Sequence, residues 1–457
     1  MFFKHFYDPD LAQGSYMVAC QNTGEALVVD PRRDIGVYLQ EAERQGFNIT
    51  DVTETHIHAD FLSGARELAA ATGAALHLSN EGDANWQYAF EHQGLRHGDE
   101  LKLGNITIKV LHTPGHTPEH LSFLITDTAT TQEPGFLLTG DFVFVGDLGR
   151  PDLLDEVANG DNTREAGARQ LFKSLKDQFL TLPDFVQVWP GHGAGSACGK
   201  ALGAVASSTV GYERRFSWWA GYLEQGDEDG FVRELLAGQP DAPHYFGRMK
   251  LHNKLGPVPL EVQPLQEFAP DKIQHEVGGS FILLDTRRLE AHQKGQVKSA
   301  LYAPWGDSFA TYAAYVVDPE ADTRPVVVLA SGEAQALEMR DRLRRVGVDK
   351  VVGFVRNLDD VWLEPVPSIS SAELRAQDNP FVLDVRTKSE HEAGHITGSR
   401  QIHAGRVLWH LHELPEDEPV VIHCQSGLRA AVAASALRSA GLEVLELAGS
   451  YAEFDKA

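Results

Sequence analysis

The chain has 457 residues, too many for one hydrophobic core, so we expect about three domains of roughly 100–200 residues each. Its formal net charge of −25 opposes binding to nucleic acid and to anionic membranes. No stretch approaches the roughly 20 apolar residues that cross a bilayer, and the first residues lack the apolar core of a signal peptide. We therefore expect a cytoplasmic protein with an acidic surface.

Short β-rich runs alternate with helical stretches up to about residue 240. From hydrophobic periodicity we expect strands at 26–29, 49–56, 106–111 and 135–141, and helices at 37–45 and 63–72. A further helical region, 212–237, carries apolar residues at helical spacings, which predicts a buried face made of Trp218, Trp219, Tyr222, Phe231 and Leu235. Residues 241–260 contain several prolines and glycines and are predicted to be a linker that packs on its neighbours.

After residue 260 the chain repeats itself. Asp285 and Arg287 follow an apolar run, with Gly295 ten residues after the aspartate, and Asp384, Arg386 and Gly394 have the same spacing. The runs 325–329 and 419–423 each precede a helical stretch that ends near a glycine. Two copies of one α/β unit are therefore expected, at 261–365 and at 366–457, after a first domain at 1–240.

Four polar motifs in the first domain follow β-rich runs. The first is His56-Ile57-His58-Ala59-Asp60, and the others contain His116, Asp141 and His192. Imidazoles and carboxylates that converge in this way suit a divalent transition metal. One HxHxD motif alone is a weak signal, but four motifs in this order are a strong one.

These motifs resemble those of the metallo-β-lactamase superfamily over residues 1–240, which implies an αββα sandwich. In the two-metal members of that superfamily a histidine follows the HxHxD motif, and this chain has Phe61 there. A phenyl ring cannot coordinate a metal, so we expect the second site to stay empty. The resemblance is then to the mononuclear branch, the persulfide dioxygenases, and it implies one Fe(II) per chain on His56, His116 and Asp141.

Two histidines and one carboxylate are the ligands of non-haem iron oxygenases, which leave positions open for substrate and O₂. His58, Asp60 and His192 would then orient ligands or waters, or serve only as structural hydrogen-bond partners. Two further residues are tentative substrate-binding candidates. Arg150 either meets a substrate carboxylate or holds a loop, and Cys198, flanked by glycines, either lies near the iron pocket or packs at a helix start.

The three cysteines, Cys20, Cys198 and Cys424, form no CxxC pair, which argues against a disulfide framework. Cys20 lies on an apolar run and is expected in the core. Cys424 ends an apolar strand and starts a loop that leads to Arg429 and a helix over 430–439. Backbone N–H groups of such a loop bind anions and stabilise a thiolate.

This loop resembles that of an active rhodanese, which implies that Cys424 carries sulfur and that Arg429 closes the anion cradle. Phosphatases also have Cys followed five residues later by Arg, but their loop is typically one residue longer. In the first copy the position that matches Cys424 is Ala330, and the matching arginine is missing too. The first copy is therefore expected to be an inactive rhodanese.

As a whole, the chain resembles the multidomain persulfide dioxygenase–sulfurtransferases of sulfide detoxification. The resemblance implies oxidation of a low-molecular-weight thiol persulfide by O₂ to sulfite, and formation of thiosulfate from sulfite and a second persulfide. A dinuclear-zinc thioester hydrolase like glyoxalase II, with appended rhodanese domains, is the alternative, and a non-catalytic scaffold is a third. The sequence leaves open the thiol carrier, the oligomeric state (a homo-oligomer is one alternative) and the passage of sulfur between the sites.

Overall fold

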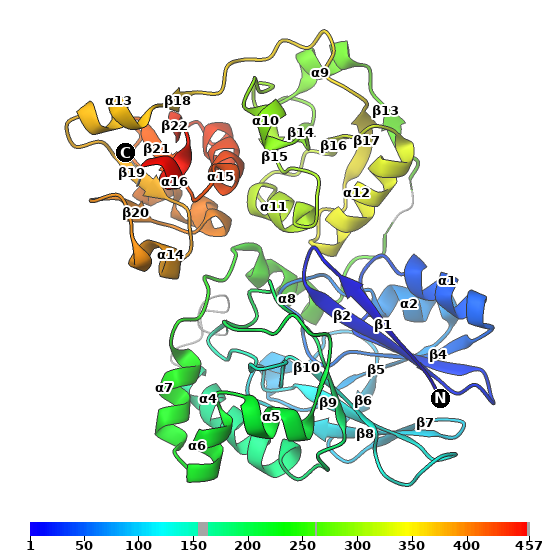
Figure 1. The fold of residues 1–457 in the computed structure, drawn as a ribbon. Helices are drawn as coiled ribbons and strands as arrows, with labels where there is room; N and C mark the ends of the chain where they lie inside the picture. The colour runs from blue at the N-terminus through cyan, green and yellow to red at the C-terminus, as the bar shows by residue number, and fades with distance from the viewer. Residues whose placement is uncertain (154–162, 261–262, 455–457) are drawn as a thin grey trace. The chain divides into compact units, whose positions relative to one another are not determined.

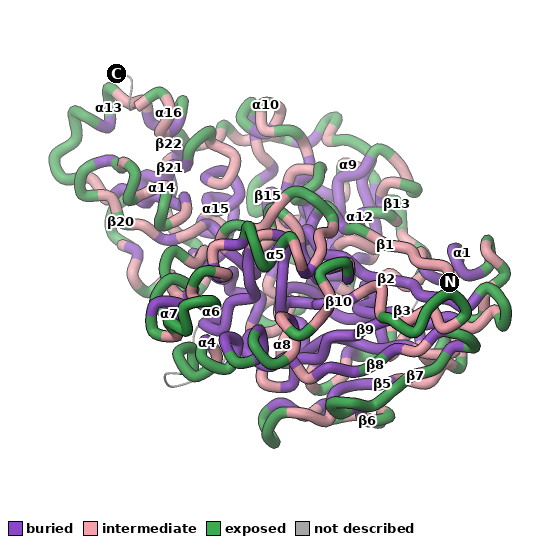
Figure 2. The backbone as a smooth tube through the Cα atoms, turned by 60° about the horizontal axis from the view of Figure 1, so that its bottom comes forward, coloured by how far each residue is buried: buried purple, intermediate pink, exposed green. Residues whose placement is uncertain are grey.

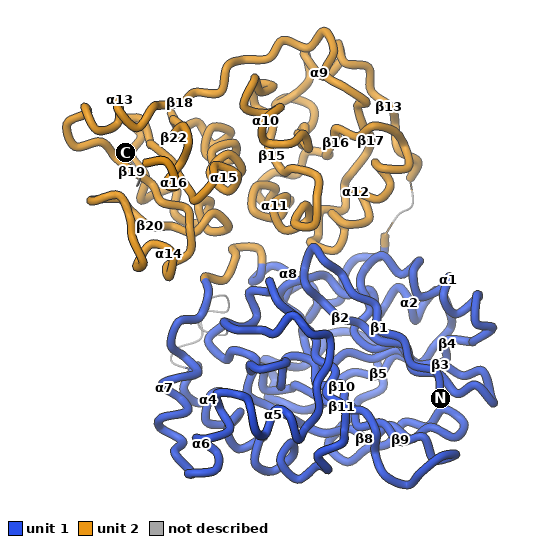
Figure 3. Tube along the Cα trace, in the orientation of Figure 1, with its two compact units in different colours: residues 1–240, 246–259 blue, residues 241–245, 260–457 orange. Residues whose placement is uncertain are grey.

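A computed structural model describes residues 1–153, 163–260 and 263–454 (Figure 1). The chain forms two compact units, residues 1–240 with 246–259 and residues 241–245 with 260–457 (Figure 3). The predicted domain limits at residues 261 and 457 lie outside the described residues. Within the described ranges, no helix is long and apolar enough to cross a membrane.

In its described part, the first unit is built on two six-stranded sheets. The strands of the first sheet, in spatial order, are β1 (Phe2–Asp8), β2 (Gln13–Ala19), β3 (Glu25–Val29), β4 (Asn48–Thr53), β5 (Ala75–Ser79) and β6 (Gln93–Leu95). Those of the second sheet are β12 (Ser208–Thr209), β11 (Gln187–Pro190), β10 (Phe136–Gly140), β9 (Leu121–Asp127), β8 (Ile106–His112) and β7 (Glu100–Leu103).

Both faces of the first sheet are buried, as the sequence of β2 illustrates. Tyr16 and Val18 pack with Ile108 and Phe123 of the second sheet, while Met17 and its neighbours pack with helix residues on the opposite face. This follows from the two-residue period of a strand, which points successive side chains to opposite faces. Strands β9 and β10 are likewise buried along most of their length (Figure 2).

Helices cover the outer face of each sheet and complete the predicted αββα sandwich. The first sheet is covered by α1 (Gly36–Gln45) and α2 (Ala65–Thr72), and the second packs with α4 (Thr163–Ser174), α5 (Val210–Phe216), α6 (Ala220–Gln225) and α7 (Glu228–Leu236). Trp219, Phe231 and Leu235 are buried in this second cluster, which confirms the predicted apolar face. A 3-10 helix, η1 (Ala84–Trp86), and a π-helical segment, η2 (Leu175–Phe179), are short, and α8 (Tyr245–Leu255) forms in the segment predicted as a linker.

The described part of the second unit contains two parallel five-stranded sheets with one and the same strand order. The first is β13 (Gln266–Glu267), β17 (Val351–Val355), β16 (Val326–Leu329), β14 (Ile282–Asp285) and β15 (Leu301–Tyr302). The second is β18 (Ser368–Ile369), β22 (Val444–Leu447), β21 (Val420–His423), β19 (Val382–Asp384) and β20 (Arg400–Gln401). The shared order confirms the duplication predicted from the repeated motifs.

The first four helices of each copy in the second unit also correspond in chain order. The first copy has α9 (Pro270–Glu276), α10 (Leu289–His292), α11 (Phe309–Val316) and α12 (Glu333–Arg345). The second copy has α13 (Ser371–Ala376), α14 (Lys388–Ala393), η3 (Ala404–Glu413), α15 (Leu428–Ser439) and α16 (Ser450–Phe454). The two copies contact each other through α11 and α15, and Tyr302 N donates a hydrogen bond to Ser435 Oγ at 2.9 Å.

Candidate metal centre and sulfur-carrier loop

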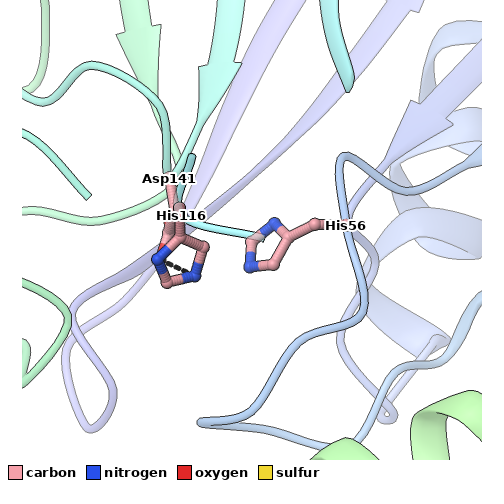
Figure 4. Close-up of side chains that lie close together, drawn as sticks. All are labelled: His56, His116 and Asp141. Atoms are coloured by element: carbon pink, nitrogen blue, oxygen red, sulfur yellow. Dashed lines mark ion pairs between the residues drawn. The ribbon is translucent and has the colours of Figure 1, made fainter. Parts of the chain in front are cut away.

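The predicted metal ligands lie in loops that follow strand ends. His56 follows β4, His116 lies between β8 and β9, and Asp141 follows β10. All three side chains are almost completely buried, and their ligand atoms lie within 4.8 Å of one another (Figure 4). His116 Nε2 is 3.6 Å from Asp141 Oδ2. The fold therefore brings together the three residues that the sequence placed on one metal.

Hydrogen bonds fix which atom each ligand offers. The Thr55 hydroxyl lies 2.9 Å from Nδ1 of His56, and Nδ1 of His116 donates to the Arg150 carbonyl at 2.9 Å, so Nε2 of each ring is left for a metal. Asp141 Oδ1 accepts from His192 Nδ1 at 2.7 Å. Asp141 Oδ2 is buried and has no hydrogen-bond partner among the described residues. An orphaned buried carboxylate oxygen beside two free imidazole nitrogens fits a bound divalent metal.

The electrostatics of these side chains favour the protonation states that a metal requires. Burial lowers the pKa of His56 and of His116, which keeps the imidazoles neutral. Burial alone would raise the pKa of Asp141, but the neighbouring His192 outweighs it and holds that pKa below its usual range. The site thus offers two neutral nitrogens and one carboxylate.

Two glycines beside this centre, Gly140 and Gly191, lie too close to other residues for a side chain to fit. A Cβ on Gly191 would lie 2.6 Å from Asp141 Oδ1, and a Cβ on Gly140, whose φ is +50°, would lie 2.5 Å from Thr55 Oγ1. Both contacts are too short for any other residue. The loops after β10 and β11 can therefore reach the centre only with glycine at these positions.

In the second unit, Cys424 directly follows strand β21 and is buried. The backbone N–H of Gly427 donates to Cys424 Sγ at 3.1 Å, and Gly427, with φ of +94°, leads into helix α15. A backbone donor and a helix N-terminus at the sulfur stabilise a thiolate or a bound anion. The loop therefore places a backbone donor and a helix start at the Cys424 sulfur.

Arg429 lies in the first turn of α15 and is paired with Glu390. Its two terminal nitrogens donate to the two carboxylate oxygens of Glu390, each at 2.7 Å. The Arg429 side chain holds the pKa of Glu390 at about 2, so the pair stays charged at neutral pH. Arg429 was predicted to close the cradle, whereas Glu390 was not predicted, because its capping box with Thr387 indicates only the start of a helix.

The first copy keeps the framework of this site without its reactive group. Asp285 pairs with Arg287 and His292 much as Asp384 pairs with Arg386 and His391, with a 3.1 Å histidine–aspartate contact in both copies. Ala330 stands where the second copy has Cys424, and its backbone N–H donates to Val355.

The first copy also contributes to a cavity of about 670 Å³ beside the Cys424 loop. Glu290 and Gln293 come from the first copy, whereas Gln425, Ser426 and Gly427 belong to the Cys424 loop. The first copy thus forms one wall of a cavity at the Cys424 loop.

Comparisons with known proteins agree with this arrangement. The metallo-beta-lactamase superfamily model matches residues 9–192, and the rhodanese-like domain model matches residues 370–457. A solved metallo-beta-lactamase structure from Staphylococcus aureus subsp. aureus COL is 38% identical, with a TM-score of 0.70, and the alignment covers 78% of this chain and 99% of that one. The chain belongs to the metallo-beta-lactamase superfamily.

Other relatives of this metallo-beta-lactamase superfamily member match more narrowly. A hydroxyacylglutathione hydrolase of Polaromonas sp. is 34% identical over 39% of this chain and 61% of its own length. A second protein of that name, from Nitrosococcus oceani, is 33% identical over the same shares. The chain therefore spans about three fifths of the length of these curated relatives. A structure of ETHE1 from Myxococcus xanthus is 25% identical, with a TM-score of 0.46, and the alignment covers 56% of this chain and 98% of that one.

In this superfamily member, the residues expected around the ligands form two sets of contacts. His192 links Asp141 to Asp60, with its Nε2 2.8 Å from Asp60 Oδ2. His58 lies 3.1 Å from Asp30, whose charge outweighs the effect of burial and raises the pKa of His58 to about 9. His192 thus holds the ligand Asp141 in place, and Asp30 holds His58 in place.

Phe61 and Cys198 lie on the second-metal side of the centre. Phe61 is fully buried, with its ring 4.4 Å from that of His58. Asp60, His192 and the sulfur of Cys198 have ligand atoms within 4.8 Å of one another. Burial raises the pKa of the Cys198 thiol to about 11. The structure thus places a thiol beside Asp60 and His192, at the site that Phe61 was expected to leave empty.

Arg150 is completely buried and holds loops together. It donates to both carboxylate oxygens of Asp152, to the Ala197 carbonyl at 3.2 Å and to the Pro240 carbonyl at 2.5 Å. This geometry favours the loop-holding alternative over contact with a substrate carboxylate.

Asn253 in helix α8 was not predicted from the sequence as part of the site. Its side chain accepts from Ser63 N at 2.9 Å and donates to the carbonyls of His58 at 2.8 Å and Phe61 at 2.7 Å. Asn253 therefore fixes the HxHxD loop from a distant part of the chain. His120 was not predicted either, although it closely follows His116 in the sequence. Its side chain accepts a hydrogen bond from the backbone N–H of Asp141 at 3.1 Å.

Proposed function

We propose that the chain oxidises low-molecular-weight thiol persulfides with O₂ and transfers sulfur through Cys424. In the first reaction a persulfide, O₂ and water give the free thiol, sulfite and two protons. In the second, sulfite and the sulfane sulfur of another persulfide give thiosulfate and a thiol. Both reactions consume the same class of substrate, which accounts for their presence in one chain.

One observation carries the proposal: a buried set of two histidines and one carboxylate shares its chain with a Cys424 loop built to hold an anionic sulfur. His56 Nε2, His116 Nε2 and Asp141 Oδ2 would hold Fe(II), one per chain. Iron(II) held in this way supplies oxygen activation, with positions left open for substrate and O₂. Phe61 in place of a further histidine supports a single metal.

The chain's own residues contribute orientation and charge at this centre. Thr55 and the Arg150 carbonyl fix the two imidazole rings, and His192 holds Asp141 through Oδ1. Because the whole set is buried, bulk water is kept from the ligand atoms. A reactive sulfur species at this site would therefore meet few competing nucleophiles.

At Cys424, the thiolate would attack the outer sulfur of a persulfide, the S–S bond would break, and the released thiolate would take a proton. The sulfur lone pair of sulfite would then attack the outer sulfur on Cys424. That step breaks the new S–S bond, forms thiosulfate and restores the thiolate. The Gly427 N–H and the start of α15 would stabilise the negative charge at each stage.

The decisive experiment is aerobic turnover of glutathione persulfide by the metal-loaded full chain, with O₂, sulfite and thiosulfate measured together. We expect O₂ uptake with sulfite as the first product and thiosulfate once sulfite and persulfide are both present. A preparation that contains bound iron but takes up no O₂ with any persulfide would contradict the proposal.

A dinuclear thioester hydrolase is the second candidate function. It is supported by Asp60, His192 and Cys198, whose ligand atoms could hold a second metal, and by relatives named hydroxyacylglutathione hydrolase. Hydrolysis of S-lactoylglutathione by a two-zinc preparation would favour this candidate. Oxygen uptake by a one-iron preparation would favour the first.

A further inference from the structure

A cavity of about 1060 Å³ lies against the loop that carries His116. Pro114 and Gly115, directly before that ligand, form part of its wall, and the side chains of α4 and α8 form others. This volume is at the upper end of what cavities for small organic ligands usually have, roughly 300–1,000 Å³. The described residues that line the cavity do not include His56, His116 or Asp141.

Two lysines of α8 give this cavity a positive side. The ammonium of Lys250 lies 3.7 Å from the centre of the Trp86 ring, and Lys254 is the next lysine along the helix. Neither lysine has a carboxylate within ion-pair distance among the described residues. Lysines that are partly buried without such a partner are unusual, because burial costs free energy that an ion pair would offset.

The negative charges near these lysines do not neutralise them. Asp83 is the single carboxylate among the described lining residues, and its side chain accepts from Asn85 N at 2.7 Å, which caps the short helix η1. The Glu119 carboxylate is buried and accepts a hydrogen bond from Ile57 N at 2.8 Å. Burial raises the pKa of Glu119 to about 7. Near neutral pH the cavity therefore keeps an excess of positive charge.

The rest of the lining is largely apolar. Leu251 is 51% exposed although it is a large hydrophobic residue, and it lies among the lining residues with Trp86 and Pro118. An aromatic ring and an exposed leucine beside two cations match an organic anion better than an inorganic one.

Helix α8 contacts both this cavity and the loop that carries His58 and Phe61. Lys250 and Asn253 are one turn apart on α8, and Asn253 holds the loop that contains His58 and Phe61. We propose that this cavity binds the carrier portion of the thiol persulfide, through an anionic carboxylate or phosphate group of the carrier that meets Lys250 and Lys254. This inference rests on the proposed function and deepens it, since it assigns the substrate an anionic carrier.

Equilibrium binding separates this inference from the chemistry at the metal. Isothermal titration calorimetry of the metal-loaded full chain would compare coenzyme A with pantetheine, which has the same thiol arm without phosphates. It would also compare glutathione with its diethyl ester. These pairs distinguish a phosphate from a carboxylate carrier. Lys109→Ala, an exposed lysine of β8 outside the cavity, is the matched control.

We expect one of the two anionic thiols to bind the wild type more tightly than its neutral counterpart. Lys250→Ala and Lys254→Ala should each weaken that binding about tenfold, the loss of one charge-assisted contact, whereas Lys109→Ala should not change it. In turnover, the same variants should raise KM for the matching persulfide and leave kcat and the iron content close to wild type.

Three results would overturn the inference: neither anionic thiol binds, the neutral thiols bind equally well, or the lysine variants bind as the wild type does. Absence of O₂ uptake together with lysine-dependent binding would instead contradict the proposed function and support an anionic ligand in the cavity. The failures of the two proposals are therefore distinguishable.

Discussion

Arg429 and Glu390 form a bidentate ion pair in the second rhodanese copy, with both nitrogen–oxygen distances at 2.7 Å. The arginine that the sequence assigned to the anion cradle thus has its charge balanced by a carboxylate. The electrostatic potential at the Cys424 sulfur depends on both partners. Removal of the arginine and removal of the glutamate should therefore change the reactivity of Cys424 in different directions.

Substitution of each partner should shift the reactivity of Cys424 in opposite directions. Arg429→Ala leaves the Glu390 carboxylate near the loop and should slow alkylation of Cys424 by iodoacetamide, about threefold or more, because a thiolate is disfavoured beside a negative charge. Glu390→Gln should accelerate alkylation. Peptide-level mass spectrometry separates Cys424 from Cys20 and Cys198. Equal effects of the two variants would argue against an electrostatic role.

Cys424→Ser should separate the two proposed reactions. The metal ligands lie in the other unit, so O₂ uptake and sulfite formation should persist while thiosulfate formation is largely lost. Ala330→Cys in that background should restore nothing, since the first copy also lacks the arginine. Oxygen, sulfite and thiosulfate would be measured together, and loss of all three would mean that persulfide must first be loaded on Cys424.

Much of this architecture is readable from local sequence patterns. The strand at 106–111 alternates between the two faces of its sheet, and the structure has β8 at Ile106–His112. The His56 and His116 motifs follow strand ends, where loops converge in sheet proteins. The rhodanese duplication followed from repeated spacings at Asp285 and Asp384, and both copies have the same strand order.

Contacts over long sequence distances could not be predicted. Asn253 lies in a segment rich in proline and glycine that predicted a linker, and its partners are about 190 residues away, in the HxHxD loop. Cys198 and Asp60 are brought together by loops whose paths no local pattern fixes. Glu390 looked like an ordinary helix-capping residue, because nothing local indicates that Arg429 will face it.

Asn253→Ala should loosen the metal-binding loop without removing a ligand. Three buried hydrogen bonds are lost, and two carbonyls and one N–H are left unpaired, so the free energy of unfolding should fall by about 3 kcal/mol. Metal affinity should fall about tenfold, as is typical when a group that supports the ligands is removed. Urea unfolding and competition with a chelator would measure both. Asn48→Ala, at an exposed position on β4, is the control.

Each chain should bind one iron, and this binding should depend on His56, His116 and Asp141 but not on the group that contains Cys198. His116→Ala should lose the metal, because two ligands seldom hold a divalent ion tightly. Cys198→Ala should leave the count unchanged, because both ring nitrogens of His192 already contact carboxylates. Elemental analysis of anaerobically prepared protein would test this. Two metals per chain, with one lost in Cys198→Ala, would favour the hydrolase.

Binding of an anionic carrier should weaken as pH rises, and the cause lies in the groups that face Lys250. Burial lowers the pKa of this lysine to about 8, with Lys254 on the same helix acting in the same direction and Glu119 opposing them. Lys250 is therefore protonated below that pH and loses its charge above it. Glu119, whose pKa burial raises to about 7, gains a negative charge over the lower part of the range. Both changes disfavour an anion.

The two contributions can be separated with one variant. An S-methylated thiol as ligand removes the titration of the thiol itself, which would otherwise fall in the same range. For the wild type, affinity should decline continuously between about pH 6.5 and pH 9. In Lys250→Arg the cation persists at all these pH values, so the decline near pH 7 due to Glu119 should remain and the decline near pH 8 should disappear. If the variant and the wild type give the same profile, Lys250 is not the cation that meets the carrier, and Lys254 must take that role.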